Sequence, residues 1–166
     1  MVCDMFASCL LDERQGDSSQ CDSCRSESCY PIISCSENGR RYKLRNDCGY
    51  NVKNYLIDGG VYVNENSMNK CDRLFLVHDP DKCTAILIEL KGKNVYHALE
   101  QLYDTAYRYR KELTEFRVRF RIVCKSVPNM ANDSKTIKLK KDMLQMFGSI
   151  PMVREYEYEE RYSKME

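Results

Sequence analysis

Two strongly apolar runs with a turn between them constrain the fold of this chain more than any other feature. Residues 71–78 (CDRLFLVH) and 84–91 (TAILIELK) are separated by the sequence Asp79-Pro80-Asp81-Lys82. Apolar runs of this length, bounded by turn residues, are typical of buried strands, and proline with aspartate favours a tight turn. The sequence therefore predicts an antiparallel hairpin.

The segments around this hairpin complete an α/β pattern. Residues 52–63 carry apolar side chains around Asp58-Gly59-Gly60, which indicates a strand pair or one kinked strand. Asn94 is a candidate N-cap for a helix over 95–113, where apolar residues recur at helical spacing. Residues 116–123 alternate apolar side chains with arginines and predict a half-exposed strand. A short helix ending near Gly148 and a tail of alternating Tyr and Glu are expected after it.

Length and composition fit one globular domain. The chain has 166 residues, of which 43% are hydrophobic and 31% charged. These values exclude wholesale disorder and two large domains. The net charge of +1 gives no global reason to expect an anionic partner, but residues 91–141 hold 13 basic and 5 acidic side chains. Positive charge is therefore concentrated in one stretch.

The N-terminal part differs in composition from the rest. Seven of the ten cysteines precede residue 50, together with a stretch rich in Ser, Asp and Gln. We expect residues 1–48 to form a cysteine-rich segment, flexible or zinc-binding, and residues 49–166 to form the folded domain. No apolar run is long enough for a membrane helix, and no basic export signal opens the sequence. We therefore expect a soluble cytoplasmic protein with no membrane partner and mostly reduced thiols.

Two carboxylates on the hairpin form the main candidate site. Glu89 and Lys91 are two residues apart in one predicted strand and therefore share a face. Asp72 opens the other strand at about the same distance from the turn, so it should lie at the same end as Glu89. Together with the backbone carbonyl of Leu90, these carboxylates suit Mg²⁺ or Mn²⁺, and Lys91 suits charge that develops on a phosphate. The alternative is a surface ion pair of Glu89 with Lys91 and an aspartate that only caps a turn.

These residues also resemble a known family. Asp72, then Glu89-Leu90-Lys91 seventeen residues later, then Gly92 and a helix bearing Gln101, look like the motif of the PD-(D/E)XK nuclease superfamily. The resemblance covers residues 52–125 and implies a restriction-endonuclease-like fold, a mixed central sheet flanked by helices in the order αβββαβ. It implies that Asp72 and Glu89 bind metal, that Lys91 is their catalytic partner and that Gln101 lines the site. It further implies hydrolysis of phosphodiester bonds in DNA or RNA, often by a homodimer or beside a partner protein.

Arginines in the basic stretch are candidates for contact with nucleic acid. Arg117, Arg119 and Arg121 alternate along one face of a predicted strand, and Arg108 lies on the preceding helix. Such side chains neutralise phosphates with little sequence preference. The alternative is that they form a solvated sheet face and a solvated helix end.

Four of the N-terminal cysteines are spaced closely enough to share a zinc ion. Cys21, Cys24, Cys29 and Cys35 lie within fifteen residues, and Zn²⁺ accepts four thiolates tetrahedrally. The first two have the usual spacing, but Cys29 and Cys35 do not. Free thiols, a disordered arm and disulfides therefore remain alternatives to zinc.

The sequence thus favours two functions for one fold. The first is a Mg²⁺-dependent nuclease that uses Asp72, Glu89, Lys91 and Gln101. The second is a noncatalytic module that binds nucleic acid or protein on the same fold.

Overall fold

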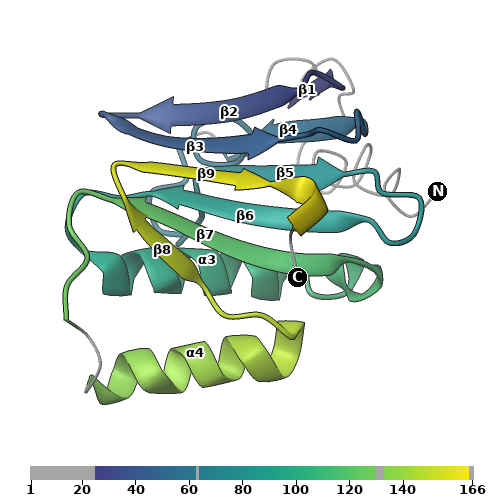
Figure 1. Cartoon of the computed structure of the whole chain (residues 1–166). Helices are drawn as coiled ribbons and strands as arrows, with labels where there is room; N and C mark the ends of the chain where they lie inside the picture. Colours follow the sequence, from purple (N-terminus) through teal and green to yellow (C-terminus); the bar gives the residue numbers. More distant parts are fainter. Residues whose placement is uncertain (1–24, 63, 130–132, 165–166) are drawn as a thin grey trace.

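The computed structural model of the protein describes residues 25–62, 64–129 and 133–164, which form two packed sheets and two α-helices (Figure 1). The larger sheet contains, in spatial order, β1 (Arg25–Ser28), β4 (Val52–Leu56), β5 (Arg73–Val77), β6 (Thr84–Leu90), β7 (Arg117–Cys124) and β8 (Met152–Glu155). The smaller sheet contains β2 (Ile32–Glu37), β3 (Arg40–Arg45) and β9 (Glu157–Arg161). The helical elements are α3 (Val95–Arg108), α4 (Ser134–Phe147) and the short 3-10 turns η3 (Glu112–Glu115) and η4 (Tyr162–Lys164).

The larger sheet is the middle layer of the protein. Helices α3 and α4 cover one of its faces, and the β2–β3–β9 sheet covers the other (Figure 1). Strands β1, β4, β5 and β6 pair antiparallel, whereas β6, β7 and β8 pair parallel. The prediction of an α/β fold with a mixed sheet is therefore confirmed. The expected helices cover only one face, because the smaller sheet occupies the other.

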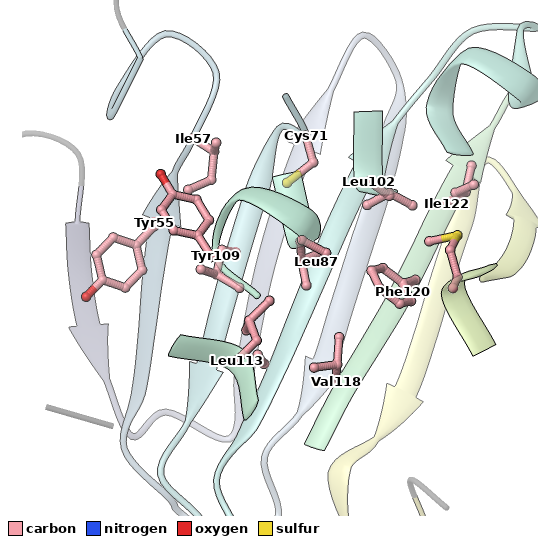
Figure 2. Close-up of a cluster of buried hydrophobic side chains, with 14 of the residues drawn as sticks. Tyr55, Ile57, Cys71, Leu87, Leu102, Tyr109, Leu113, Val118, Phe120 and Ile122 are labelled. Atoms are coloured by element: carbon pink, nitrogen blue, oxygen red, sulfur yellow. The ribbon is translucent and has the colours of Figure 1, made fainter. Parts of the chain in front are cut away.

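The hairpin predicted from the two apolar runs is β5 and β6. All seven residues of β6 are buried, since both faces of this strand are covered. Leu87 packs with α3 and β7 in the cluster under the helices (Figure 2), while Ile86 and Ile88 pack against the smaller sheet. A strand buried on both faces needs a continuous apolar run rather than an alternating one. Glu89 is the charged residue in this run.

Helix α3 begins where the sequence predicts and ends earlier. The side chain of Asn94 accepts a hydrogen bond from the backbone N–H of His97 at 3.0 Å, as expected of an N-cap. The helix stops at Arg108 instead of continuing to residue 113. Leu113 still reaches the core, but from the turn η3. Its helical spacing from Ala106 therefore did not require a continuous helix.

The C-terminal part is more regular than the sequence suggested. Helix α4 has Asp133 as its N-cap and ends at Gly148, whose φ of 68° suits a residue without a side chain. The alternating tail forms β8 and β9, and Tyr156, with φ of 57°, lies where the chain passes from the larger to the smaller sheet. Among the described helices, none is long and apolar enough to cross a membrane.

The boundary expected near residue 48 lies inside one folded unit. Strand β3 pairs in parallel with β9 near the other end of the chain, and β1 pairs with β4. Residues 25–48 therefore contribute strands to both sheets. The part of the cysteine-rich segment before residue 25 lies outside the described residues.

Candidate active site

Asp72 and Glu89 face each other at the point where β5 and β6 separate. The last pair in the ladder is Arg73 with Ile88, so the next position places Asp72 opposite Glu89. At this position, hydrogen bonds from backbone N–H groups to side chains take the place of the backbone hydrogen bonds of the β5–β6 ladder. Oδ2 of Asp72 accepts from the backbone N–H of Leu90 at 2.6 Å, and Oε2 of Glu89 accepts from the backbone N–H of Asp72 at 3.2 Å. The predicted convergence of these two residues at one end of the hairpin matches this geometry.

Both carboxyl groups lie in a poor environment for negative charge. Glu89 is 1% exposed, and burial followed by the charge of Asp72 raises its pKa to about 9. Burial also raises the pKa of Asp72 to about 6, although the hydrogen bond from the Leu90 N–H opposes this effect. Two adjacent buried carboxylates repel each other unless a proton or a cation lies between them. The pair is therefore suited to binding a positive ion.

Lys91, the residue after the end of β6, lies on the same side of the sheet as Glu89. Its Nζ lies 3.5 Å from Oε1 of Glu89 and donates to Oε1 of Gln101 at 2.6 Å. The amide of Gln101 is itself oriented, because its Nε2 donates to the backbone carbonyl of Lys70 at 2.9 Å. Helix α3 thus fixes the Lys91 ammonium beside the carboxylates. All four residues of the predicted site, Asp72, Glu89, Lys91 and Gln101, lie together.

Thr105 and Lys70 support the site, although neither was predicted from the sequence. Oγ1 of Thr105, one helical turn after Gln101, accepts from the backbone N–H of Cys71 at 2.8 Å and donates to the carbonyl of Gln101. Lys70 is buried, and its Nζ donates to the Glu65 carbonyl and lies 3.4 Å from Oδ1 of Asp58. A single loop lysine has no sequence signal that distinguishes it from a solvated one. A threonine four residues after a glutamine on a helix could have been expected to share its face.

The donors at this end of the sheet suit a hard cation. The N–H of Leu90 points to Asp72, and the carbonyl of a strand residue points to the same edge as its N–H. Asp72, Glu89 and the Leu90 carbonyl would then supply oxygen ligands, which Mg²⁺ and Mn²⁺ prefer. Within the described residues, no group of three or more His, Cys, Asp or Glu side chains could hold a metal ion. Two carboxylates with water and substrate oxygens are nevertheless a usual set for Mg²⁺.

The arginines expected to contact nucleic acid do not form one surface. Arg121 is 5% exposed and makes a bidentate pair with Glu160, with Nε to Oε1 at 2.6 Å and Nη2 to Oε2 at 2.9 Å. The face of β7 that was expected to be half-exposed is covered by the smaller sheet, which explains this difference. Arg117 and Arg119 are half-buried, and Arg117 lies opposite Thr84 at the far end of β6 from Leu90. Arg108 lies apart from them, on α3.

The structure describes two of the four cysteines in the predicted zinc site. Cys21 and Cys24 lie outside the described residues. Cys29 is exposed, whereas Cys35 is buried between the sheets, where burial raises the pKa of its thiol to about 12. Zinc binds the thiolate, so Cys35 in this position is a poor ligand. Cys71 and Cys124 are buried, as the sequence indicated.

Comparison with known proteins gives no family for this chain. No family model and no curated protein matches it.

Proposed function

We propose that the protein is a divalent-metal-dependent nuclease that hydrolyses phosphodiester bonds in nucleic acid. The observation that carries this proposal is the placement of Asp72 and Glu89 opposite each other, Glu89 buried and Asp72 half-buried, with the ammonium of Lys91 beside them. A surface ion pair does not account for a glutamate that is 1% exposed next to a second carboxyl group. The alternative in which Asp72 only caps a turn leaves the proximity of Glu89 unexplained.

Each residue has a distinct part in this proposal. Asp72, Glu89 and the Leu90 carbonyl hold the cation, which when bound stabilises negative charge on a phosphate oxygen and lowers the pKa of the attacking water. Lys91 has three N–H donors, of which one is used by Gln101 and another is directed near Glu89. The third can donate to the phosphate as negative charge develops in the transition state. Gln101 is a positioning residue that fixes the direction of this ammonium.

The order of elements supports the same proposal. Strands β4, β5 and β6, helix α3 and strand β7 follow one another as in the βββαβ part of the restriction-endonuclease-like fold. Asp72 lies just before β5, Glu89 on β6, Lys91 just after β6 and Gln101 on the following helix, an arrangement that resembles the PD-(D/E)XK motif and supports the proposal. This agreement adds to the site geometry but does not replace it.

The test is a nuclease assay with matched variants. Purified wild-type protein is incubated with single- and double-stranded DNA and RNA in Mg²⁺, in Mn²⁺ and in chelator. We expect cleavage that chelator stops and that Asp72→Asn, Glu89→Gln and Lys91→Met each abolish. Glu159→Gln is the control, because Glu159 is an exposed residue of β9 in surface ion pairs. Cleavage without metal, or equal cleavage by all variants, would refute the proposal.

A second measurement detects the cation without cleavage. A ligand that binds only the folded state raises its thermal stability. We expect Mg²⁺ or Mn²⁺ to raise the melting temperature of the wild type and of Glu159→Gln, but not of the Asp72→Asn, Glu89→Gln double variant. Nucleic-acid binding with neither cleavage nor this metal effect would instead support the noncatalytic interaction module.

A further inference from the structure

A cavity lies between helix α3 and the loop that leads to Asp72. Its volume is about 510 Å³, and it is lined by Ser67, Met68, Asn69, Asp104, Tyr107 and Arg108. The chain at Asn69 and the helix at Asp104 are joined by a hydrogen bond of 2.8 Å from Nδ2 to Oδ2. This bond occupies one oxygen of Asp104, the acidic side chain among the lining residues, whose negative charge remains, and Arg108 is the basic side chain of the lining. The cavity therefore has a cation at its wall.

Arg108 is held in place with an unused donor. Its guanidinium lies over the ring of Tyr62, with Cζ 5.2 Å from the ring centroid. Among the described residues, its buried Nη1 has no hydrogen-bond partner. A guanidinium pairs best with an anion that offers two oxygens, such as phosphate. Because Nη1 is buried, the guanidinium would have to turn toward the cavity to meet such a partner.

The cavity is connected to the candidate active site through helix α3 and the loop before Asp72. Gln101, Asp104 and Arg108 are spaced by three and four residues on α3 and therefore share one face. Gln101 contacts Lys91 and the Lys70 carbonyl, and Asn69, the residue before Lys70, contacts Asp104. The seven residues from Gln101 to Arg108 span about 10 Å along the helix. Phosphates of one strand follow each other at about 3.4 Å along a duplex axis and farther apart when the strand is extended. A strand that runs along α3 would therefore pass from Gln101 to Arg108 in at most about three nucleotides.

We propose that this cavity binds a backbone phosphate of a single nucleic-acid strand, held by Arg108, one to three nucleotides from the bond that is cleaved. The inference rests on the proposed nuclease function and names a substrate contact for it. A single strand fits because the cavity is bounded by the helix on one side and by residues 67–69 on the other. Arg108 is then the residue that sets how the strand lies relative to Lys91.

The test is the salt dependence of oligonucleotide binding. Fluorescence anisotropy is measured with a labelled single-stranded DNA oligonucleotide in Ca²⁺, which also takes oxygen ligands. One lost phosphate contact lowers the slope of log affinity against log salt by about 0.7, which is about fivefold in affinity at 0.1 M salt. We expect this change in Arg108→Gln. Arg161→Gln is the matched control, since Arg161 is exposed on β9 in the smaller sheet, and it should keep the wild-type slope.

Two further arms separate charge from structure. Arg108→Lys keeps the charge and should restore the slope while it binds less tightly than wild type, because an ammonium lacks the planar fork. Single neutral methylphosphonate linkages, placed in turn along the oligonucleotide, should weaken wild-type binding at one position and leave Arg108→Gln unaffected there. Melting curves of all variants check that they are folded. If Arg108→Gln does not fold, Arg108→Lys and the linkage scan decide alone.

The outcomes distinguish this inference from the nuclease proposal. An unchanged salt slope in Arg108→Gln, with Mg²⁺-dependent cleavage intact in the wild type, refutes the role of Arg108 and leaves the nuclease standing. If Arg108→Gln lowers the salt slope only with duplex DNA, the proposed contact with a single strand is refuted. A wild type that neither binds nor cleaves any nucleic acid refutes both.

Discussion

Among the described residues, a pair of opposite charges and a pair of like charges lie on opposite faces of the larger sheet, and they are built in opposite ways. Arg121 and Glu160 are of opposite sign, and the carboxylate also accepts from the Tyr42 hydroxyl at 2.7 Å, so its oxygens are occupied. Asp72 and Glu89 are of the same sign, and each uses one oxygen for a backbone N–H. The first cluster is complete within the protein, whereas the second lacks a positive charge of equal size. This difference separates a structural pair from a candidate binding site.

The largest expected effect comes from breaking the complete cluster. Arg121→Ala would leave the carboxylate of Glu160, a residue of β9 in the smaller sheet, without its cation. Removal of one partner of a buried ion pair typically costs about 3–5 kcal/mol. We expect a loss of this size in the free energy of unfolding, measured by urea denaturation. The double variant Arg121→Met, Glu160→Met should recover most of it, and a loss under 1 kcal/mol in the single variant would contradict the comparison.

The Asp72–Glu89 cluster should make the free energy of unfolding depend on pH. In chelator, the raised pKa of Glu89, about 9, means that the folded state holds a proton that the unfolded state releases above its ordinary pKa of 4.5. Stability is therefore fully present below about pH 4.5 and is lost as pH rises toward 9, by at most about 1.4 kcal/mol per pH unit. Between pH 6 and 8, we expect wild-type protein to lose up to about 3 kcal/mol of unfolding free energy.

Glu89→Gln is the matched variant for this measurement. It has no proton to lose, so its unfolding free energy in chelator should vary less with pH than that of the wild type. Asp72, whose pKa is raised from 3.8 to about 6, contributes mainly below pH 6, outside the range compared. Identical pH profiles for the two proteins would show that Glu89 is not the buried acid described here.

Loss of the Gln101 side-chain amide should have an effect of intermediate size, on the rate of cleavage. Gln101→Leu removes the acceptor that holds Lys91 at 2.6 Å. Loss of such an outer partner typically costs tenfold to a hundredfold in activity. We expect kcat for the cleaved oligonucleotide to fall by this factor with KM nearly unchanged. Gln145→Leu, at an exposed position of α4, is the control, and equal kcat values in both variants would remove Gln101 from the site.

The smallest change in unfolding free energy is expected for a substitution of Arg119, which lies beside the Arg121–Glu160 pair. Arg119 precedes Arg121 on the same face of β7 but is half-buried and donates to the Val118 carbonyl. Burial, followed by the charges of Arg121 and Arg117, lowers the pKa of its guanidinium, so its removal relieves repulsion as well as losing a contact. We expect Arg119→Gln to change the unfolding free energy by no more than about 0.5 kcal/mol. A loss comparable to that of Arg121→Ala would show that the two arginines act together.

The sequence predicted one of these clusters and missed the other for a physical reason. Asp72 and Glu89 lie on a hairpin with a short turn, so counting residues from the turn was enough to place them opposite each other. Arg121 and Glu160 are 39 residues apart, and the strand that bears Glu160 belongs to a different sheet. Local alternation showed that the arginines of β7 share a face, but it could not show that a second sheet covers this face.

The same limit applies to the site itself. The positions of Glu89, Lys91 and Gln101 follow from one strand and the helix after it. Lys70 and Thr105 contribute through contacts between the loop before β5 and α3. A loop without regular period gives no register, so its residues could be assigned only from coordinates.

The parallel pairing of β3 with β9 has a consequence for how the chain reaches its native state. Residues such as Lys43 and Glu157 are 114 positions apart, yet their side chains lie 2.9 Å from each other. Contacts between such distant segments can form only after a large loop has closed. Because closing this loop costs conformational entropy, such contacts slow folding. During synthesis, the hydrophobic surface that β9 covers must stay exposed until the last of these strands leaves the ribosome. The smaller sheet therefore cannot be completed before residues 157–161 have been synthesised.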